Sequence, residues 1–172
     1  PYPAGNNTAY ACINGRDTKL LKKAGLPETR VFLMNNPVED ESTQLPVLPA
    51  EEANELRHRF YAHYRSQFPG LNPEAKMLFY PVRTIRRKNA LEAGLIAAVS
   101  EKPVNLILSL PGVSAQEQTY SDLCEKSFKS GLIPGIWGSG TSNSPEVPGY
   151  PQMLQICDLI ISSSVQEGFG YM

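Results

Sequence analysis

The sequence predicts an α/β fold in which a parallel β-sheet is covered by helices on both faces. From residue 77 onward, short apolar runs alternate with segments of helical periodicity. The runs at residues 77–82 and 104–110 are almost continuously apolar, which is typical of strands buried on both faces. Because parallel strands need a crossover between them, the alternation predicts one sheet built from strand–helix units.

The first part of the chain predicts a separate, shorter set of elements. Residues 16–25 predict a short helix, because leucines and an alanine recur at helical spacing before a Gly-Leu-Pro stop. Residues 31–34 form a compact apolar run that predicts a buried strand. Residues 38–49 have no period and contain three acids, so they predict a linker or surface loop. A domain boundary is therefore expected near Pro37.

An amphipathic helix is predicted over residues 50–67, where apolar residues recur at helical spacing before a Pro-Gly stop. Its two histidines, His58 and His63, lie about 140° apart around the helix, a geometry that disfavours a shared metal ion. The elements that follow are a strand at 77–82, a helix at 88–100, a strand at 104–110, a helix at 115–130, a strand at 133–137, a short helix at 151–157 and a strand at 158–163.

The arrangement of the four strands from residue 77 onward depends on the type of sheet. If they follow the doubly wound order, the third strand is followed by the second, the first and the fourth. This order leaves an open apolar edge, so the chain is expected either to dimerise through that edge or to be part of a longer protein. The start at Pro1 and the end at Met172, directly after a predicted helix start, also suggest an excerpt.

Composition excludes several classes of protein. The 172 residues are 41% hydrophobic and 19% charged, with 16 Lys and Arg against 17 Asp and Glu, so global disorder is excluded. A net charge of −1 gives no overall field that would attract nucleic acid. No apolar run approaches a bilayer span, and residues 1–7 lack the charged and apolar regions of a signal peptide. The three cysteines are far apart and form no metal-binding motif. A soluble cytoplasmic protein without a metal is expected.

Ligands of such sheets bind outside the carboxyl ends of the strands, so the residues after each strand are candidates for chemistry. After the strand at 77–82 come four cations within six positions, including Arg83 and Lys88. These cations and the free N–H groups of the next helix would favour a phosphate or pyrophosphate. The alternative is a basic surface turn whose side chains are simply solvated.

The last predicted strand runs into a second candidate segment, in which small residues precede Glu167, Gly168, Phe169 and Gly170. Glycines let the backbone approach a ligand closely, and a carboxylate can accept hydrogen bonds from hydroxyl groups. This combination suits a sugar that carries a phosphate. The alternative is a glycine-rich turn that only backbone geometry requires.

The third candidate is the sole tryptophan, Trp137, which ends an apolar strand and is followed by Gly138. A nucleobase could lie against this edge and accept or donate backbone hydrogen bonds. The alternative is that Trp137 simply packs against the core or its rim, which is the commoner role of a lone Trp at a strand end.

The order and spacing of these segments resemble the retaining glycosyltransferases of the two-Rossmann-domain (glycosyltransferase-B) fold, group 1, family four-like. Arg83 and Lys88 match the Arg and Lys that hold the donor diphosphate in that family. The segment Ser-Val-Gln-Glu-Gly-Phe-Gly at 164–170 matches the family signature Ser-x-x-Glu-Gly-Phe-Gly. The two motifs are separated by about 80 residues, as in the family.

The resemblance implies a domain organisation. Residues 1–37 are expected to be the end of the acceptor-side domain and the crossover. Residues 38–76 are expected to be a linker and an amphipathic helix, and residues 77–172 a Rossmann-like donor-binding domain, truncated at its C-terminal end. The family's second Glu would fall beyond the chain, and residues 109–113 depart from the family's glycine-bearing loop.

The resemblance also implies a reaction. A hexose would move from a nucleotide-diphosphate sugar to an unknown sugar, lipid or small-molecule acceptor with retention of configuration. Arg83, Lys88 and Glu167 would be the catalytic residues, while Gly168, Phe169, Gly170, Trp137 and Gly138 would bind the donor. No cofactor or metal is expected, nor is binding to nucleic acid or membrane. The fragment alone would be inactive.

Two other functions stay open. The chain could be a non-catalytic module that binds a nucleotide sugar or phosphate. A nucleic-acid patch over the basic turn is less favoured, because aromatic residues do not interleave with the cations.

Overall fold

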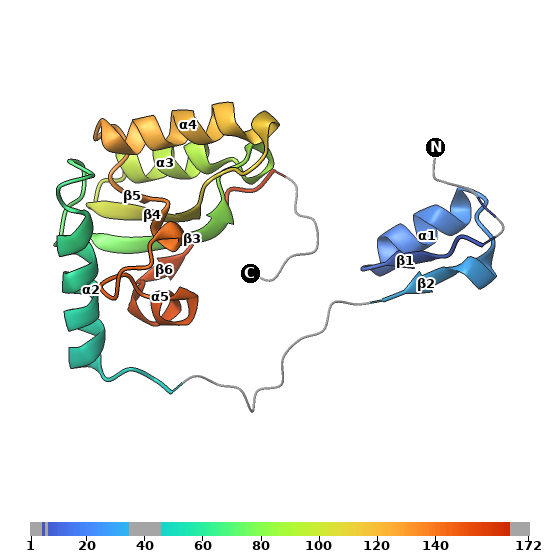
Figure 1. Ribbon diagram of the computed structural model, residues 1–172, viewed down its shortest axis with the longest axis horizontal. Helices are drawn as coiled ribbons and strands as arrows, with labels where there is room; N and C mark the ends of the chain where they lie inside the picture. Colours follow the sequence, from blue (N-terminus) through green and yellow to red (C-terminus); the bar gives the residue numbers. More distant parts are fainter. Residues whose placement is uncertain (1–4, 6, 35–45, 166–172) are drawn as a thin grey trace. The chain divides into compact units, whose positions relative to one another are not determined.

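The structure is a computed structural model that describes residues 5, 7–34 and 46–165. The chain divides into two compact units, one formed by residues up to 44 and the other by residues 45–167 (Figure 1). Each unit has its own sheet and its own buried side chains.

The smaller unit is a strand–helix–strand motif. Its elements are β1 (Tyr10–Cys12), α1 (Gly15–Lys23), a 3₁₀ turn η1 (Glu28–Arg30) and β2 (Val31–Leu33). The two strands are parallel, and α1 begins after Asn14, whose side chain accepts a hydrogen bond from the Asp17 N–H at 2.8 Å. The predicted helix and strand are confirmed to within two residues. β1 was not predicted, because three residues are too few to show a period.

The larger unit contains a four-stranded parallel sheet. Its strands are β3 (Lys76–Arg83), β4 (Val104–Leu110), β5 (Gly135–Trp137) and β6 (Leu159–Ile160). They lie in the order β5-β4-β3-β6, which confirms the predicted α/β class and the predicted doubly wound order. The outer strand β6 is shorter than predicted, and its two side chains are more than half exposed.

Helices cover both faces of this sheet. The crossover helices are α3 (Ala90–Val99) and α4 (Ala115–Lys129), and the other two are α2 (Ala50–Tyr64) and α5 (Tyr150–Ile156). Figure 1 shows α3 and α4 together over one face, and α5 lies on the other side of the sheet, where it contacts α2 and β3. Helix α2, which the sequence placed in the linking segment, belongs to this unit.

The start of α3 differs from the prediction. A 3₁₀ turn, η3 (Arg86–Lys88), follows β3, and Asn89 then adopts the left-handed conformation with φ 50° and ψ 43°. Since a left-handed residue cannot continue a right-handed helix, α3 begins at Ala90 and not at Lys88. The basic cluster therefore lies on a turn that is separate from the helix.

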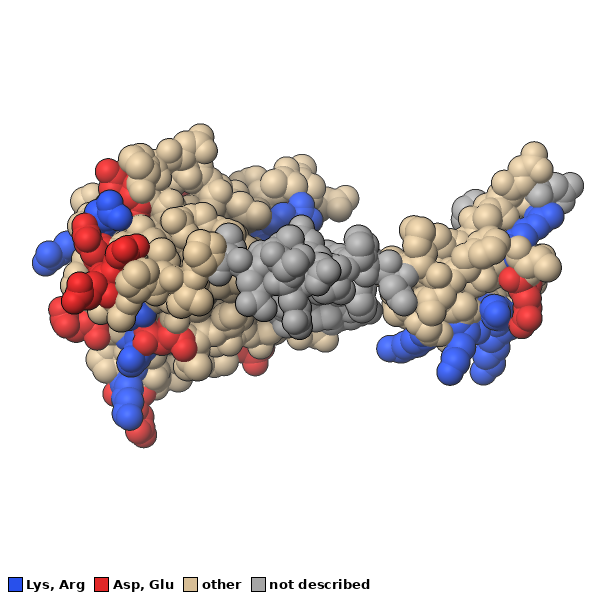
Figure 2. Space-filling model, turned by 90° about the horizontal axis from the view of Figure 1, so that it is seen from below, with Lys and Arg blue, Asp and Glu red and all other residues tan. Residues whose placement is uncertain are grey.

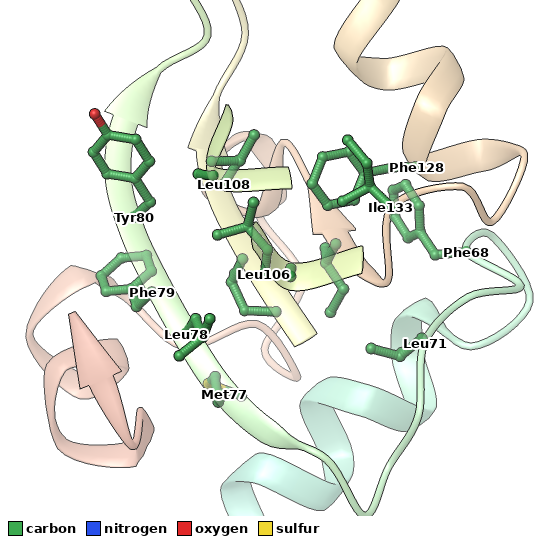
Figure 3. Packing of buried hydrophobic residues seen from close by; sticks show 14 of the residues in the cluster. Phe68, Leu71, Met77, Leu78, Phe79, Tyr80, Leu106, Leu108, Phe128 and Ile133 are labelled. Atoms are coloured by element: carbon green, nitrogen blue, oxygen red, sulfur yellow. The ribbon is translucent and has the colours of Figure 1, made fainter. Parts of the chain in front are cut away.

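One apolar core fills the space between the sheet and its helices (Figure 3). Met77, Phe79 and Tyr80 of β3 are at most 1% exposed, as are the central residues of β4. Phe60 and Tyr61 of α2 are equally buried. The continuous apolar runs that predicted these strands are thus explained by burial on both faces.

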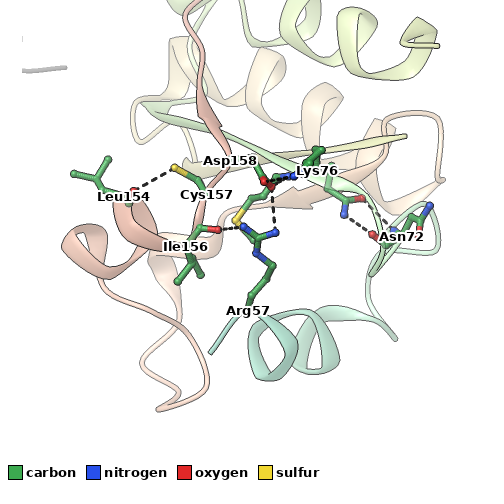
Figure 4. Close-up of polar contacts among 9 residues, drawn as sticks. Arg57, Asn72, Lys76, Leu154, Ile156, Cys157 and Asp158 are labelled. Carbon is green, nitrogen blue, oxygen red and sulfur yellow. Dashed lines mark hydrogen bonds and ion pairs between the residues drawn. The ribbon is translucent and has the colours of Figure 1, made fainter. Parts of the chain in front are cut away.

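Polar contacts tie the amino ends of the strands to α2 and α5 (Figure 4). The Asp158 carboxylate accepts hydrogen bonds from Lys76 Nζ and from the Met77 N–H, each at 2.8 Å, and pairs with Arg57 Nη1 at 3.1 Å. Arg57 also donates to the carbonyl oxygen of Ile156. This cluster fixes the entry of β6 beside β3.

On the face of the larger unit seen in Figure 2, acidic and basic side chains are intermixed. On the smaller unit, several basic side chains gather together, and α1 alone supplies Arg16, Lys19, Lys22 and Lys23. Among the described residues, no helix combines the length and the hydropathy needed to traverse a lipid bilayer.

Candidate functional site

The candidate site lies at the carboxyl edge of the four-stranded sheet. Because all four strands are parallel, β3 ends there at Arg83, β4 at Leu110, β5 at Trp137 and β6 at Ile160. Three of the segments that the sequence singled out follow these strand ends. The fold therefore brings to one edge residues that are far apart in the chain.

The basic turn after β3 is partly held by α4. Arg83 has a 45% exposed side chain, and its Nη2 lies 3.6 Å from Glu117 Oε1. The Arg86 guanidinium lies over the ring of Tyr120, 5.7 Å from the ring centroid. Neighbouring turns of one helix thus contact two of the cations.

Glu117 keeps its negative charge because of its place in the first turn of α4. Its carboxylate accepts hydrogen bonds from the backbone N–H groups of Val113 at 3.0 Å and Ser114 at 3.2 Å, forming a capping box. These two bonds hold the pKa of Glu117 below its usual value, and nearby Arg83 lowers it further. At neutral pH the positive charge of Arg83 therefore faces a fixed counter-charge.

The N–H groups of α3 are less available than the sequence suggested. The N–H of Leu91 donates to the Tyr120 hydroxyl at 3.1 Å, and that of Glu92 donates to the carbonyl of Asn89 at 3.1 Å. The expectation that free N–H groups of this helix join the cations is therefore wrong for these two residues. The cause is the turn η3, which moves the helix start away from the strand end.

The segment after β6 is bonded directly to the basic turn. The hydroxyl of Ser163 donates to the carbonyl oxygens of Asn89 at 2.8 Å and Lys88 at 3.3 Å. The N–H of Val165 donates to the carbonyl of Arg87 at 3.2 Å. The chain therefore enters the predicted signature segment beside the predicted diphosphate-binding turn.

The hydroxyl of buried Tyr80, in β3, contacts both the basic turn and the segment after β6. It lies 2.8 Å from the Lys88 carbonyl oxygen and 2.8 Å from Ser164 Oγ. Sequence analysis missed this residue, because a tyrosine inside an apolar strand gives no sign that its hydroxyl reaches the strand end. Glu117 was missed as well, since its helix position predicts only a capping role.

The loop after β4 is closely packed against β3 and α4. The Gly112 N–H donates to Ser121 Oγ at 2.9 Å, and a Cβ on Gly112 would lie only 2.8 Å from Glu117 Cβ. Buried Thr84 donates from its hydroxyl to the Leu110 carbonyl at 2.7 Å. Only glycine fits this approach of the loop to the helix.

Trp137 is anchored by packing and by one hydrogen bond. Its Nε1 donates to Thr84 Oγ1 at 3.1 Å, and its ring packs against the core. Trp137 and Gly138 line a pocket of about 260 Å³, whose other walls include Tyr64 and Ser142. The structure thus supplies a packing role for Trp137, while base binding by Trp137 and Gly138 stays a prediction.

The four remaining site residues lie outside the described residues. They are Glu167, Gly168, Phe169 and Gly170. The described part of the larger unit ends at Val165, so the structure shows the residues that lead into the signature segment and only its first two residues, Ser164 and Val165. Within residues 7–34 and 46–165, no group of three or more His, Cys, Asp or Glu side chains is arranged to hold a metal ion.

Comparison with known proteins gives one informative relative. The chain is 36% identical over 172 aligned residues to a mannosylglucosyl-3-phosphoglycerate synthase from Petrotoga mobilis (strain DSM 10674 / SJ95). The alignment covers 98% of this chain and 32% of that synthase, so the chain spans about a third of the relative's length. No family model matches the chain. The chain is thus similar to part of a sugar-phosphoglycerate synthase and has a Rossmann-like α/β fold.

Proposed function

We propose that this chain is the donor-binding part of a retaining glycosyltransferase that uses a nucleotide-diphosphate sugar. The observation that carries the proposal is the junction at the carboxyl edge of the sheet, where the segment leading to Glu167 is hydrogen-bonded to the turn that carries Arg83 and Lys88. A donor lying across this junction would place its diphosphate and its sugar on adjacent segments.

Arg83 and Lys88 supply the positive charge in this proposal. They neutralise the diphosphate and stabilise the negative charge that grows on it as the glycosidic bond breaks. Glu117 lies 3.6 Å from Arg83 and restrains the guanidinium at the end of β3. A leaving diphosphate would meet a guanidinium that is already in position, which reduces the cost of reorganisation.

Glu167 and the backbone of Gly168, Phe169 and Gly170 hold the sugar hydroxyls in this proposal. Trp137 and Gly138 form the edge of the donor site nearest to β5. No metal takes part, since two cations neutralise the leaving group.

The related synthase supports the assignment to sugar transfer. It is named for a product in which mannosyl and glucosyl groups are attached to 3-phosphoglycerate. Making such a product requires new glycosidic bonds, so mannose- and glucose-bearing donors are the first to test. A phosphoglycerate-bearing acceptor is the corresponding first choice.

The experiment is calorimetric titration of the chain with UDP-, GDP- and ADP-linked glucose and mannose. We expect at least one donor to bind, and the double variant Arg83→Ala with Lys88→Ala to lose about tenfold in affinity for each cation. The matched control is Arg65→Ala with Lys102→Ala, which removes two exposed cations that lie before β3 and β4. It should bind the donor as well as the unchanged chain does.

Two results would overturn the proposal. One is a chain that binds none of these donors. The other is an equal loss of affinity in the two double variants, because the effect would then reflect overall charge alone. Binding without transfer or hydrolysis, even with acceptor present, would favour the non-catalytic binding module.

A further inference from the structure

Tyr80 lies between the two segments that form the proposed donor site. We propose that Tyr80 is a positioning residue, whose buried hydroxyl holds Lys88 and Ser164 in register so that a diphosphate can bind. The inference rests on the proposed function, because it concerns the same site. It adds a residue that contacts no ligand and acts through the basic turn.

The ring and the hydroxyl of Tyr80 have different surroundings. The residue is fully buried in β3, and its ring belongs to the core cluster. Figure 3 shows its oxygen directed toward the end of the strand, away from the packed carbon atoms. The ring thus anchors the side chain, while the hydroxyl reaches the turn at the carboxyl edge.

The direction of the hydrogen bonds follows from proton counting. A tyrosine hydroxyl has one proton, and the Lys88 carbonyl can only accept, so Tyr80 donates to Lys88 at 2.8 Å. The contact with Ser164 Oγ, also 2.8 Å, must then use the Ser164 proton. A chain of hydrogen bonds runs from Ser164 through Tyr80 to Lys88.

This direction has a consequence for Ser164. Because the Ser164 hydroxyl donates its proton in the hydrogen bond to Tyr80, it can only accept hydrogen bonds from a bound molecule. Phosphate oxygens need donors, so the Ser164 hydroxyl in this state does not donate to the diphosphate. Its role is to fix the start of the signature segment against the basic turn.

The basic turn needs such support. It is only three residues long, and it is followed by Asn89 in the left-handed conformation. The carbonyl of Lys88 is held by Tyr80 and, at a longer 3.3 Å, by Ser163. Loss of the shorter bond would let the Lys88 backbone shift, and displacements of about 1 Å are enough to weaken a positioned contact severely.

The test compares two buried tyrosines of the same unit. Tyr80→Phe removes one hydroxyl at the carboxyl edge, while the control Tyr61→Phe removes one beside Arg57 and Asp158, near the amino ends of the strands. Each variant is titrated with the nucleoside diphosphate and the nucleoside monophosphate of the best-binding donor. Melting temperatures of both variants should agree within about 4 °C.

We expect Tyr80→Phe to weaken diphosphate binding about tenfold and monophosphate binding less than twofold, as loss of one hydrogen bond allows. Tyr61→Phe should leave the diphosphate-to-monophosphate ratio unchanged. A general loss of stability would weaken the binding of both ligands by the same factor. A change in the ratio of the two affinities therefore indicates a positioning role and not a structural one. Ser163→Ala removes the other hydroxyl that donates to the Lys88 carbonyl, so it should also weaken diphosphate binding more than monophosphate binding. This variant replaces Tyr80→Phe in the test if Tyr80→Phe does not fold.

The outcomes separate the two proposals. If the unchanged chain binds the diphosphate and Tyr80→Phe keeps its ratio, the inference about Tyr80 is wrong and the proposed function stands. If the unchanged chain binds no nucleoside diphosphate or nucleotide sugar, the proposed function is wrong, and the inference falls with it.

Discussion

Asp158 is a partly buried carboxylate at the amino ends of β3 and β6. Its side chain is 18% exposed and contacts Lys76, Arg57 and the backbone of Met77. Partial burial raises the pKa of Asp158, but the hydrogen bonds from Lys76 and Met77 and the charge of Arg57 outweigh it, so the pKa lies below its usual 3.8. The ionised form is thus the one that the fold stabilises.

We predict that Asp158→Asn lowers the free energy of unfolding at pH 7 by about 1 to 3 kcal/mol, because Arg57 and Lys76 lose their shared partner. The folded-state pKa is the lower one, so the contribution is full above 3.8 and disappears as the pH falls through the folded value. Urea unfolding should therefore show a difference from the unchanged chain that shrinks below pH 3.8.

The control for Asp158→Asn is Asp122→Asn, which neutralises an exposed acid of α4 that accepts a hydrogen bond from Gln118 at 2.7 Å. This variant should stay within about 0.5 kcal/mol of the unchanged chain. A stability difference for Asp158→Asn that is independent of pH would contradict the assignment of its effect to charge.

Arg83 illustrates what the sequence can predict of a single residue. The cluster of cations after an apolar strand was visible in the sequence, and so was its place at a strand end. The pairing with Glu117 was not, because Glu117 belongs to the next crossover helix, and only the packing of α4 brings it to 3.6 Å. Local patterns give the charge of a residue, while its partner depends on tertiary packing.

The pairing of β4 with β5 depends on one glycine. Gly135 begins β5 with φ 131°, a conformation that side chains rarely adopt. A Cβ there would lie 2.0 Å from the carbonyl oxygen of Leu106 and 2.6 Å from its nitrogen. The backbone of β5 can approach β4 this closely only because no side chain intervenes.

We predict that Gly135→Ala destabilises the larger unit by about 4 kcal/mol or more, since backbone atoms of a central strand would have to move. Gly131→Ala is the matched control, because Gly131 has φ 77° and a Cβ there would meet no atom closer than 3.5 Å. It should cost about 1 to 2 kcal/mol from backbone strain alone. Thermal unfolding measures both, and equal costs would contradict the proposed clash.

The boundaries of α3 and β6 show where periodicity stops being informative. Both were predicted to be longer than they are. α3 begins late because Asn89 is left-handed, and β6 is short because only Leu159 and Ile160 pair with β3. Apolar spacing predicts the middle of an element, whereas turn geometry and the neighbouring strand decide its ends.

The two units differ greatly in how much they bury. The core cluster lies entirely between Leu56 and Ile156, within the larger unit. Among the described residues of the smaller unit, only Cys12 and Val31 are buried. A domain of few buried side chains cannot offset the loss of chain entropy on folding. Stability of the chain is therefore concentrated in the larger unit.

We predict that residues 45–172 alone unfold cooperatively, with a melting temperature within about 5 °C of that of the 172-residue chain. Residues 1–44 alone should show no cooperative transition, because the two side chains buried among the described residues of this unit do not make a core. Circular dichroism of the two pieces tests both statements. A large drop in the melting temperature of residues 45–172 would show that the first unit contributes to its stability.

Local patterns are enough to predict the α/β class and the strand end that carries the cations, because hydrophobic periodicity acts over short stretches of chain. The strand order was expected only on the condition that the sheet is doubly wound, and the fold meets that condition. The hydrogen bond between Tyr80 and Ser164, 84 positions away, and the pairing of Glu117 with Arg83 could be seen only in the folded chain. The physical reason is that hydrogen bonds and ion pairs between distant segments form only once packing has brought those segments together.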